Sequence, residues 1–126
     1  MVWIHGGGFT GGSSYTSAVG DINKLLKIPA MYDSSHLSNI SNTIIVSVNY
    51  RLGAFGFLRV VSNSTSADSN TTQSAYGTAG LEDQRSALQW VQRNARAFGG
   101  DPTKVTLFGE SAGAVSYTHL TLPTKA

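Results

Sequence analysis

The sequence predicts an α/β fold in which crossover helices join the strands of a mostly parallel sheet. Two apolar runs, Thr43–Asn49 and Val105–Phe108, have the composition of buried strands, and the segment between them repeats apolar residues at helical spacing. Strand, helix and strand in alternation are typical of a parallel sheet with crossover helices. The chain has 126 residues, which is enough for one domain at most.

The first 42 residues are expected to contain the end of one strand and little other regular structure. Residues 1–4 are apolar and typical of a strand end, and the glycine-rich residues 5–12 form a loop after it. Residues 13–42 are rich in serine and irregular, apart from one short helix expected over Asp21–Lys27. The run Thr43–Asn49 follows, and its composition predicts a strand buried on both faces.

Two segments after this strand are expected to be loops. Gly53 and Gly56, with the aromatic Phe55 and Phe57, interrupt the apolar run. Residues 61–76 are rich in Ser, Asn and Thr and have no periodicity, which predicts a flexible surface loop.

The clearest predicted helix comes next. Its apolar residues are spaced by seven, three, four and three positions, which places them on one helical face: Leu81, Leu88, Val91, Ala95 and Phe98. Glu82 and Asp83 lie at the amino end, where the helix dipole favours acids. Gly99-Gly100 and Pro102 are expected to end the helix before the strand Val105–Phe108.

A G-x-S-x-G motif, Gly109–Gly113, follows this strand directly. In that setting the serine, Ser111, sits on a tight strand-to-helix turn that exposes its hydroxyl group. The flanking glycines are expected because the turn is strained and a Cβ atom at either position would clash. The pattern predicts that Ser111 is a nucleophile.

A second motif, His5–Phe9, follows the first strand with the sequence HGGGF. A strand that leads into an HGGG loop supplies the backbone N–H donors of an oxyanion hole. Each such donor stabilises the anionic tetrahedral intermediate of acyl transfer by about 3 kcal/mol. The alternative is a glycine-rich turn between strands. The serine motif downstream favours the oxyanion loop, because each motif supplies what the other lacks.

Composition and charge narrow the classes of partner. The net charge of +2 is too small to indicate a nucleic-acid or membrane partner. These 126 residues contain no transmembrane run or signal peptide, which says nothing about residues outside them. There are no cysteines. The glycine-rich segments lack the lysine of a P-loop and the ordered G-x-G-x-x-G of a dinucleotide site, so no nucleotide, metal or other cofactor is indicated.

Three N-x-S/T sequons begin at Asn39, Asn63 and Asn70. They are glycan acceptors only in a protein of the secretory pathway. The alternative is chance in a chain rich in Ser, Thr and Asn. We expect a secreted or ER-lumenal glycoprotein.

Five blocks together resemble the type-B carboxylesterases, the group that includes cholinesterases and bile-salt lipases. The blocks are HGGGF, NYRLGAFGFL, GLEDQR with LQWV, FGGDP and GESAG, at residues 5–9, 49–58, 80–91, 98–102 and 109–113. Their order and spacing match over residues 1–114, apart from the loops. The segment Thr16–Pro29 looks like an insertion. The resemblance implies an α/β-hydrolase fold and cofactor-free hydrolysis of a small-molecule or lipid ester.

The resemblance also implies roles for single residues. Ser111 is the nucleophile, the backbone N–H groups of Gly7, Gly8 and Ala112 form the oxyanion hole, and Glu110 is a buried acid that tunes the site. His5 holds the oxyanion loop, and Gly6 is a turn residue rather than a donor. The remaining matched residues are structural or in the core: Asn49, Arg51, Asp83, Gln84 and Trp90.

Residues 1–114 are expected to be the amino-terminal part of an α/β-hydrolase domain truncated at both ends, because such a domain normally needs about 200 residues. Residues 115–126 resemble the translated end of a transposase adapter used in sequencing libraries and are expected to be a non-native tail. His119 lies in that tail, and a helix after Ser111 would carry it away from the serine. The family's catalytic acid and histidine come later in the chain, so the 126 residues alone are expected to be inactive and poorly soluble.

Two alternatives remain beside the enzyme. The same fold has non-catalytic adhesion and scaffold members, such as the neuroligins, which commonly lose the nucleophile. A truncated gene product without function is the other. Ser111 and the HGGG loop are both intact, which favours the enzyme.

Overall fold

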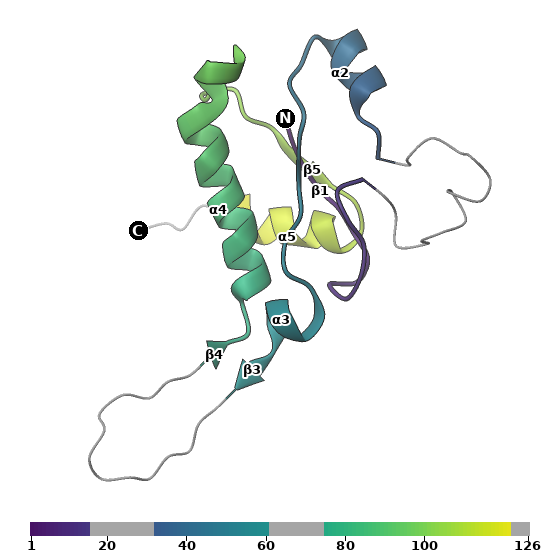
Figure 1. Cartoon of the computed structure of the whole chain (residues 1–126), viewed down its shortest axis with the longest axis vertical. Helices are drawn as coiled ribbons and strands as arrows, with labels where there is room; N and C mark the ends of the chain where they lie inside the picture. The colour runs from purple at the N-terminus through teal and green to yellow at the C-terminus, as the bar shows by residue number, and fades with distance from the viewer. Residues whose placement is uncertain (16–31, 61–74, 122–126) are drawn as a thin grey trace, which may run out of the picture.

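The computed structural model describes residues 1–15, 32–60 and 75–121 (Figure 1). Its centre is a parallel sheet of three strands, β1 (Val2–Ile4), β2 (Val46–Val48) and β5 (Leu107–Gly109). The strand order is β2-β1-β5, so the earliest strand lies in the middle. Each parallel neighbour is reached through a crossover connection. The predicted α/β class with a parallel sheet is confirmed.

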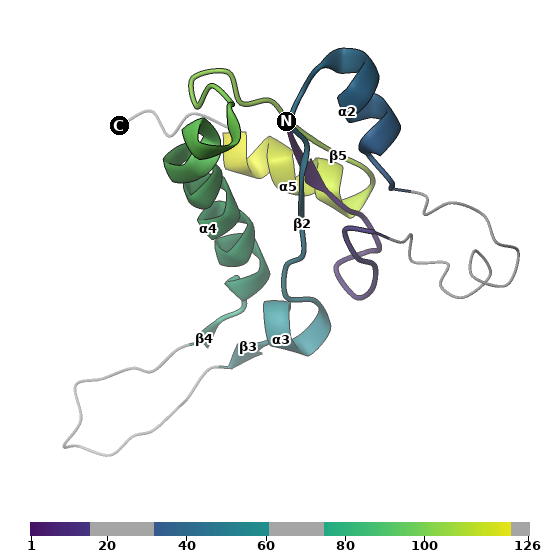
Figure 2. The same ribbon diagram turned by 45° about the horizontal axis from the view of Figure 1, so that its top comes forward.

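The core lies between this sheet and helix α4 (Ala79–Asn94). Val2 and Val48 are buried against Val91 of the helix, and five partly buried residues complete the cluster: Val46, Ala87, Leu88, Val105 and Leu107. A second helix, α5 (Ala112–Thr121), packs on β5 and β1. Figure 2 shows both helices close to the three strands.

Strand β2 differs from its prediction. It covers only three residues of the run Thr43–Asn49, and along it Val46 is partly buried, Ser47 exposed and Val48 buried. This is the alternation of a half-buried strand, so the expectation of burial on both faces is wrong. Among the described residues, β2 pairs only with β1, which leaves it at an edge of the sheet.

The expected loop at Gly53 is also wrong, because Gly53–Phe57 forms the short helix α3. Two backbone hydrogen bonds form this helical turn. Gly56 N–H donates to Leu52 O at 3.2 Å, and Leu58 N–H donates to Ala54 O at 3.1 Å. The absence of a side chain at Gly56 allows this turn, since a Cβ atom there would overlap the carbonyl oxygen of Arg51. The glycines therefore permit a compact turn of helix here.

A small antiparallel pair follows α3. Strand β3 (Arg59–Val60) pairs with β4 (Ala75–Tyr76). The last two residues of the segment 61–76, predicted as a loop, therefore form a strand. The rest of that segment, 61–74, lies outside the described residues.

Helix α2 (Ser35–Ser41) lies in the segment that was expected to be irregular. Polar residues fix both of its ends. The carboxylate of Asp33 accepts a hydrogen bond from Ser35 N–H at 2.9 Å, and Asn42 adopts the left-handed conformation at the carboxyl end. The composition that suggested irregular structure supplies the end residues of a helix instead. The helix expected over Asp21–Lys27 lies outside the described residues.

The predicted long helix and its end are confirmed. Helix α4 is followed by a 3₁₀ turn, Ala95–Phe98, and Gly99 ends it in the left-handed conformation at φ +81°. The predicted apolar face is only partly buried, because Phe98 is 63% exposed. Trp90 is 44% exposed, so its expected place in the core is wrong. The two rings pack against each other at a centroid distance of 5.8 Å.

Helix α5 crosses the boundary expected after residue 114. Ser116, the second residue beyond that boundary, is 1% exposed and bonded to α4 through Gln84. Residues 122–126 lie outside the described part of the chain. The assignment of residues 115–126 to a non-native tail stays a prediction.

Substituting Gly80 by alanine is expected to destabilise the protein. An alanine in a helix is normally more stable than a glycine, but here the added Cβ would lie 2.5 Å from the Phe57 ring and 2.6 Å from the carbonyl oxygen of Arg51. Overpacking of this kind lowers the free energy of unfolding by about 1–3 kcal/mol. Urea unfolding of the complete protein would measure it. Gly11→Ala is the matched control, since no atom of the described residues lies within 4 Å of its Cβ position. Equal stability of the two variants would contradict the clash.

Candidate active site

Ser111 lies between the end of β5 and the start of α5 with a φ angle of +52°. Few residues other than glycine adopt this left-handed conformation. It turns the chain sharply from strand to helix, and Ser111 is exposed there. The predicted strained turn at the G-x-S-x-G motif is confirmed.

The two glycines of the motif are required by close backbone packing. A Cβ atom at Gly109 would lie 2.8 Å from Ile4 O, and one at Gly113 would overlap the same oxygen. Gly113 N–H donates to Glu110 O at 2.9 Å, which closes the turn. The first turn of α5 therefore lies directly against the end of β1, and the predicted clash of a Cβ atom at either glycine is confirmed.

The glycine loop after β1 adopts conformations that suit its predicted use. Gly7 and Gly8 have φ angles of +110° and +62°. The Gly7 carbonyl accepts hydrogen bonds from the N–H groups of Thr10 at 3.2 Å and Gly11 at 3.1 Å, which folds the loop back on itself. Within the described ranges, the N–H groups of Gly7 and Gly8 donate to no other residue. Both donors are therefore available.

The loop and the serine turn meet at one edge of the sheet. Because β1 and β5 are parallel neighbours, with Ile4 opposite Gly109, their carboxyl ends lie together. A Cβ atom on Gly6 would lie 2.9 Å from the Cβ atom of Ser111, so Gly6 packs directly against the turn. Ala112 is the first residue of α5, where a backbone N–H has no partner within the helix. The structure thus brings together the predicted nucleophile and oxyanion loop.

His5 supports the loop from beneath. Its side chain is buried, stacks on Tyr50 at 4.6 Å and bonds through Nδ1 to Gly6 O at 2.7 Å. The Tyr50 hydroxyl donates to His5 O at 2.8 Å. Burial raises the pKa of Tyr50, which keeps this hydroxyl protonated and able to donate. The expected loop-holding role of His5 agrees with these contacts.

Residues 49–53, which follow β2, bind the glycine loop and the chain just after it. Asn49 Oδ1 accepts a hydrogen bond from Ser14 N–H at 2.7 Å, and Phe9 O accepts one from Gly53 N–H at 2.7 Å. Phe9 itself packs on Phe57 at 5.0 Å between ring centroids. These contacts hold the glycine loop at Phe9 and the chain just after the loop at Ser14.

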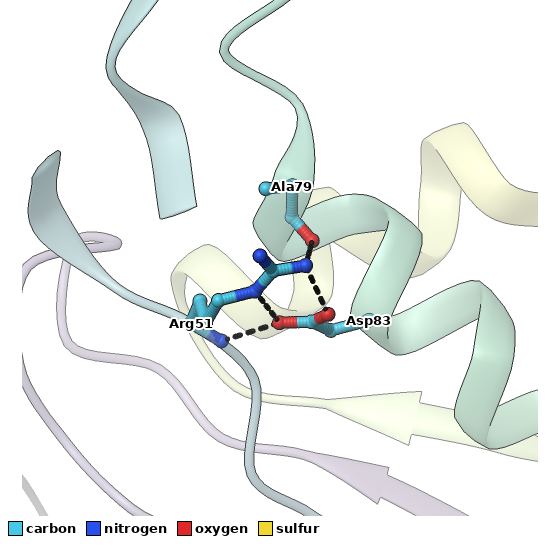
Figure 3. Close-up of polar contacts among 3 residues, drawn as sticks. All are labelled: Arg51, Ala79 and Asp83. Atoms are coloured by element: carbon cyan, nitrogen blue, oxygen red, sulfur yellow. Dashed lines mark hydrogen bonds and ion pairs between the residues drawn. The ribbon is translucent and has the colours of Figure 1, made fainter. Parts of the chain in front are cut away.

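Arg51 and Asp83 clamp that segment to α4 (Figure 3). The guanidinium donates from Nε and Nη2 to the two carboxylate oxygens at 2.7 Å each, and Arg51 N–H donates to Oδ2 at 2.9 Å. Nη2 also donates to Ala79 O at 3.4 Å. These hydrogen bonds from Arg51 lower the pKa of Asp83. The structural roles expected for Asn49, Arg51 and Asp83 are confirmed.

Gln84, the next residue on α4, is also structural, as expected. Its side chain is completely buried, and its amide donates to the hydroxyl of Ser116 on α5 at 3.2 Å. Sequence reasoning gave no partner to Gln84 and no role to Ser116 or Tyr50. Their contacts join residues 32 and 45 positions apart, which local patterns do not reveal.

Glu110 does not have the burial expected for it, because the structure leaves it exposed. Its Oε2 lies against Gly6 and accepts a hydrogen bond from the Tyr32 hydroxyl at 3.5 Å. Burial and the negative charge of Glu110 both raise the pKa of Tyr32. Among the described residues, these contacts leave the rest of the carboxylate open to solvent.

His119 lies on α5, two turns beyond its start, and is exposed. The helix carries it away from Ser111, as expected. No imidazole among residues 1–15, 32–60 and 75–121 is hydrogen-bonded to Ser111. In the same ranges, no group of three or more His, Asp or Glu residues could hold a metal ion. None of the described helices is long and apolar enough to cross a membrane.

A cavity of about 530 Å³ lies at the opposite end of the sheet. Its lining includes Met1, Val46 and Val105 at the amino ends of the strands, together with Trp90 and Phe98. Ser111 and the glycine loop do not line it. The cavity is therefore separate from the candidate active site.

A family model, related sequences and solved structures all match this chain, and all of them are esterases or cholinesterases. A family model, the Carboxylesterase family, matches residues 1–126. Cholinesterase 1 of Branchiostoma lanceolatum is 47% identical over 116 residues, which cover 92% of this chain and 26% of that protein. Acetylcholinesterase of Danio rerio is also 47% identical over 116 residues, covering 92% of this chain and 15% of that protein. A solved thermophilic pNB esterase has a TM-score of 0.69 at 44% identity, covering 95% of this chain and 20% of that one. The chain thus spans roughly a quarter or less of the length of these relatives.

The Arg51–Asp83 clamp is expected to give a pH-dependent stability. The pKa of Asp83 is lowered in the folded state, so its contribution is present above the unfolded value of about 3.9 and is lost as the pH falls through the folded value. Arg51→Met is therefore expected to lower the melting temperature by a few degrees at pH 7 and by less near pH 3.

Calorimetry of the complete protein at both pH values would measure the difference. Arg85→Met is the control, because within the described part of the chain Arg85 forms only an exposed 3.5 Å ion pair with Glu82 on the same helix. If Arg51→Met lowers the melting temperature by the same amount at pH 7 and at pH 3, the pH-dependent role of the Arg51–Asp83 pair is contradicted.

Proposed function

Because the chain belongs to the carboxylesterase family, in its type-B, cholinesterase-like branch, we propose that it supplies the nucleophile and the oxyanion hole of a carboxylic-ester hydrolase. The parallel sheet and its helices are part of an α/β-hydrolase fold. One observation carries the proposal. Ser111 sits at a left-handed turn beside a glycine loop in which the N–H groups of Gly7 and Gly8 have no partner within the described chain.

The reaction begins when Ser111 Oγ attacks the carbonyl carbon of the ester. The new C–O bond pushes the carbonyl electrons onto oxygen, and the N–H groups of Gly7, Gly8 and Ala112 receive that oxyanion. Each donor contributes about 3 kcal/mol of stabilisation. Collapse of the intermediate breaks the bond to the alkoxy oxygen, the alcohol leaves, and an acyl-enzyme remains on Ser111. Water then releases the carboxylic acid and restores the serine.

The proton of Ser111 must pass to a base, which then donates it to the alkoxy oxygen as the alcohol leaves. His119 is wrongly placed to be that base. In the α/β-hydrolase order, the acid and the histidine follow the nucleophile in the chain. We therefore assign both to residues of the complete protein beyond this chain. Residues 1–126 alone remain inactive under this proposal.

Glu110 is proposed to tune the site as a negative charge next to Ser111. Its carboxylate lies against Gly6, at the base of the oxyanion loop, and is bonded to Tyr32. A negative charge there favours the positive imidazolium that forms during attack. The substrate class is a small-molecule or lipid ester, since the reaction needs only an acyl carbonyl and a leaving alcohol.

Ser111→Ala in the complete protein is expected to lower kcat for 4-nitrophenyl acetate by about 10⁴-fold or more, because no nucleophile remains. Labelling by a fluorophosphonate probe should vanish as well. Ser86→Ala, which removes an exposed hydroxyl on α4, is the control and should keep both.

Two outcomes would contradict this assignment in different ways. Full turnover by the Ser111→Ala variant would show that another residue is the nucleophile. A folded wild-type protein that neither turns over esters nor reacts with the probe would instead support the non-catalytic adhesion or scaffold alternative.

We further propose that the protein is secreted or ER-lumenal and carries a glycan on Asn39. This residue is exposed on α2, and its sequon ends at Ser41. The sequons at Asn63 and Asn70 lie outside the described residues.

The glycan is tested by expression in a secretory host and by the mass released with a peptide N-glycosidase. Ser41→Ala should remove one glycan mass, because it destroys the sequon, whereas Ser41→Thr should retain it. Equal masses for the two variants would rule out a glycan at Asn39.

A further inference from the structure

We propose that Gln84 is a positioning residue for the oxyanion hole, acting through Ser116, which lies one turn beyond Ala112 on α5. The inference rests on the proposed function, because it concerns the donor that Ala112 contributes. Gln84 touches neither Ser111 nor the glycine loop through any hydrogen bond of the described chain. It acts on the site only through the helix that carries Ala112.

The hydrogen bonds run in one direction from α4 to Ala112. Gln84 Nε2 donates to Ser116 Oγ at 3.2 Å, and Ser116 Oγ donates to Ala112 O at 3.1 Å. A hydroxyl group has one proton, so Ser116 can donate to Ala112 only while it accepts from its other partner. The amide of Gln84 fits that requirement. Both side chains are buried, at 0% and 1% exposure, so solvent does not compete.

Only one half of the Gln84 amide is hydrogen-bonded in the described chain. Its Oε1 is buried and has no hydrogen-bond partner in the described chain. An unpaired buried carbonyl costs free energy, which an apolar side chain of similar size would avoid. The contact that Gln84 does make in the described chain is the N–H donation to Ser116.

Helix α4 holds both halves of the oxyanion hole through consecutive residues. Asp83 binds Arg51, whose segment ties down the glycine loop, and Gln84 binds the helix that begins with Ala112. Three donors from two different segments must point at one oxygen atom. Errors of a fraction of an ångström weaken such donors, so a common support on one rigid helix sets their alignment.

Gln84→Met in the complete protein is expected to lower kcat about tenfold and to change KM by less than about twofold, because only transition-state binding is affected. Gln92→Met is the matched control. Gln92 lies on the same helix and donates to Pro102 O at 2.9 Å, outside the candidate site. An unchanged kcat in Gln84→Met, with an active wild type, would overturn the inference and leave the proposed function intact.

A double variant separates positioning from stability. Ser116→Ala alone leaves the Gln84 amide unpaired in the core, so both the melting temperature and kcat should fall. Gln84→Met combined with Ser116→Ala removes both polar groups, so the melting temperature should recover while kcat stays low. Recovery of kcat together with the melting temperature would show that the pair is only structural and would overturn the inference.

Amide hydrogen exchange gives a readout that does not depend on activity. Faster exchange in the peptide 109–116 of Gln84→Met than of Gln92→Met would support the positioning role, and equal exchange would overturn it. A wild-type protein without esterase turnover would refute the proposed function, whereas the exchange comparison would still decide whether Gln84 orders the start of α5.

Discussion

The close approach of α5 to the end of β1 is the constraint on which the rest of the site depends. Gly113 can pack against the carbonyl oxygen of Ile4 only because it has no Cβ atom, and Gly109 has the same restriction. This contact places the residue after β5 beside the loop after β1. The parallel pairing of the two strands alone brings their ends to one edge, but the missing side chains let the backbones nearly touch. Ser111 and the glycine loop become neighbours as a consequence.

Once that contact exists, the surrounding side chains hold two separate chain segments in place, the glycine loop and the start of α5. His5 and Tyr50 fill the space under the loop, and Asn49 binds its far end. On the other side, α4 reaches both the segment after β2 and the start of α5. The site is thus supported mostly by residues that take no part in bond making. The contacts of Tyr50 and Gln84 are buried and that of Arg51 with Asp83 is multidentate, which is the kind of support that fixes backbone donors in place.

The sequence predicted the parts of the site that local backbone geometry determines. The tight turn at Ser111 and the folded loop at Gly7 follow from glycine spacing after a strand, and both occur as expected. The parts that depend on distant neighbours were not predictable. Tertiary packing decides three features that the sequence did not predict: helix α3, the exposure of Trp90 and the burial of Ser116. The spacing of apolar residues along the chain does not encode such packing. The exposure of Glu110 has the same origin. Whether its side chain is buried depends on which distant residues pack over it, and the G-x-S-x-G motif does not specify them.

The strained residues show how the turn and the loop act together. Three residues other than glycine have positive φ angles in the described chain: Phe9, Asn42 and Ser111. Asn42 ends α2, a common place for this conformation, but the other two flank the candidate oxyanion hole. Each such residue costs on the order of 1 kcal/mol and persists only where its surroundings leave no alternative. Phe9 is held by its ring contact with Phe57 and by the N–H of Gly53, and Ser111 by the glycine contacts of its turn. The protein therefore bears the cost of ordering these groups when it folds, so that the donors and the hydroxyl are already in place when an ester carbonyl arrives.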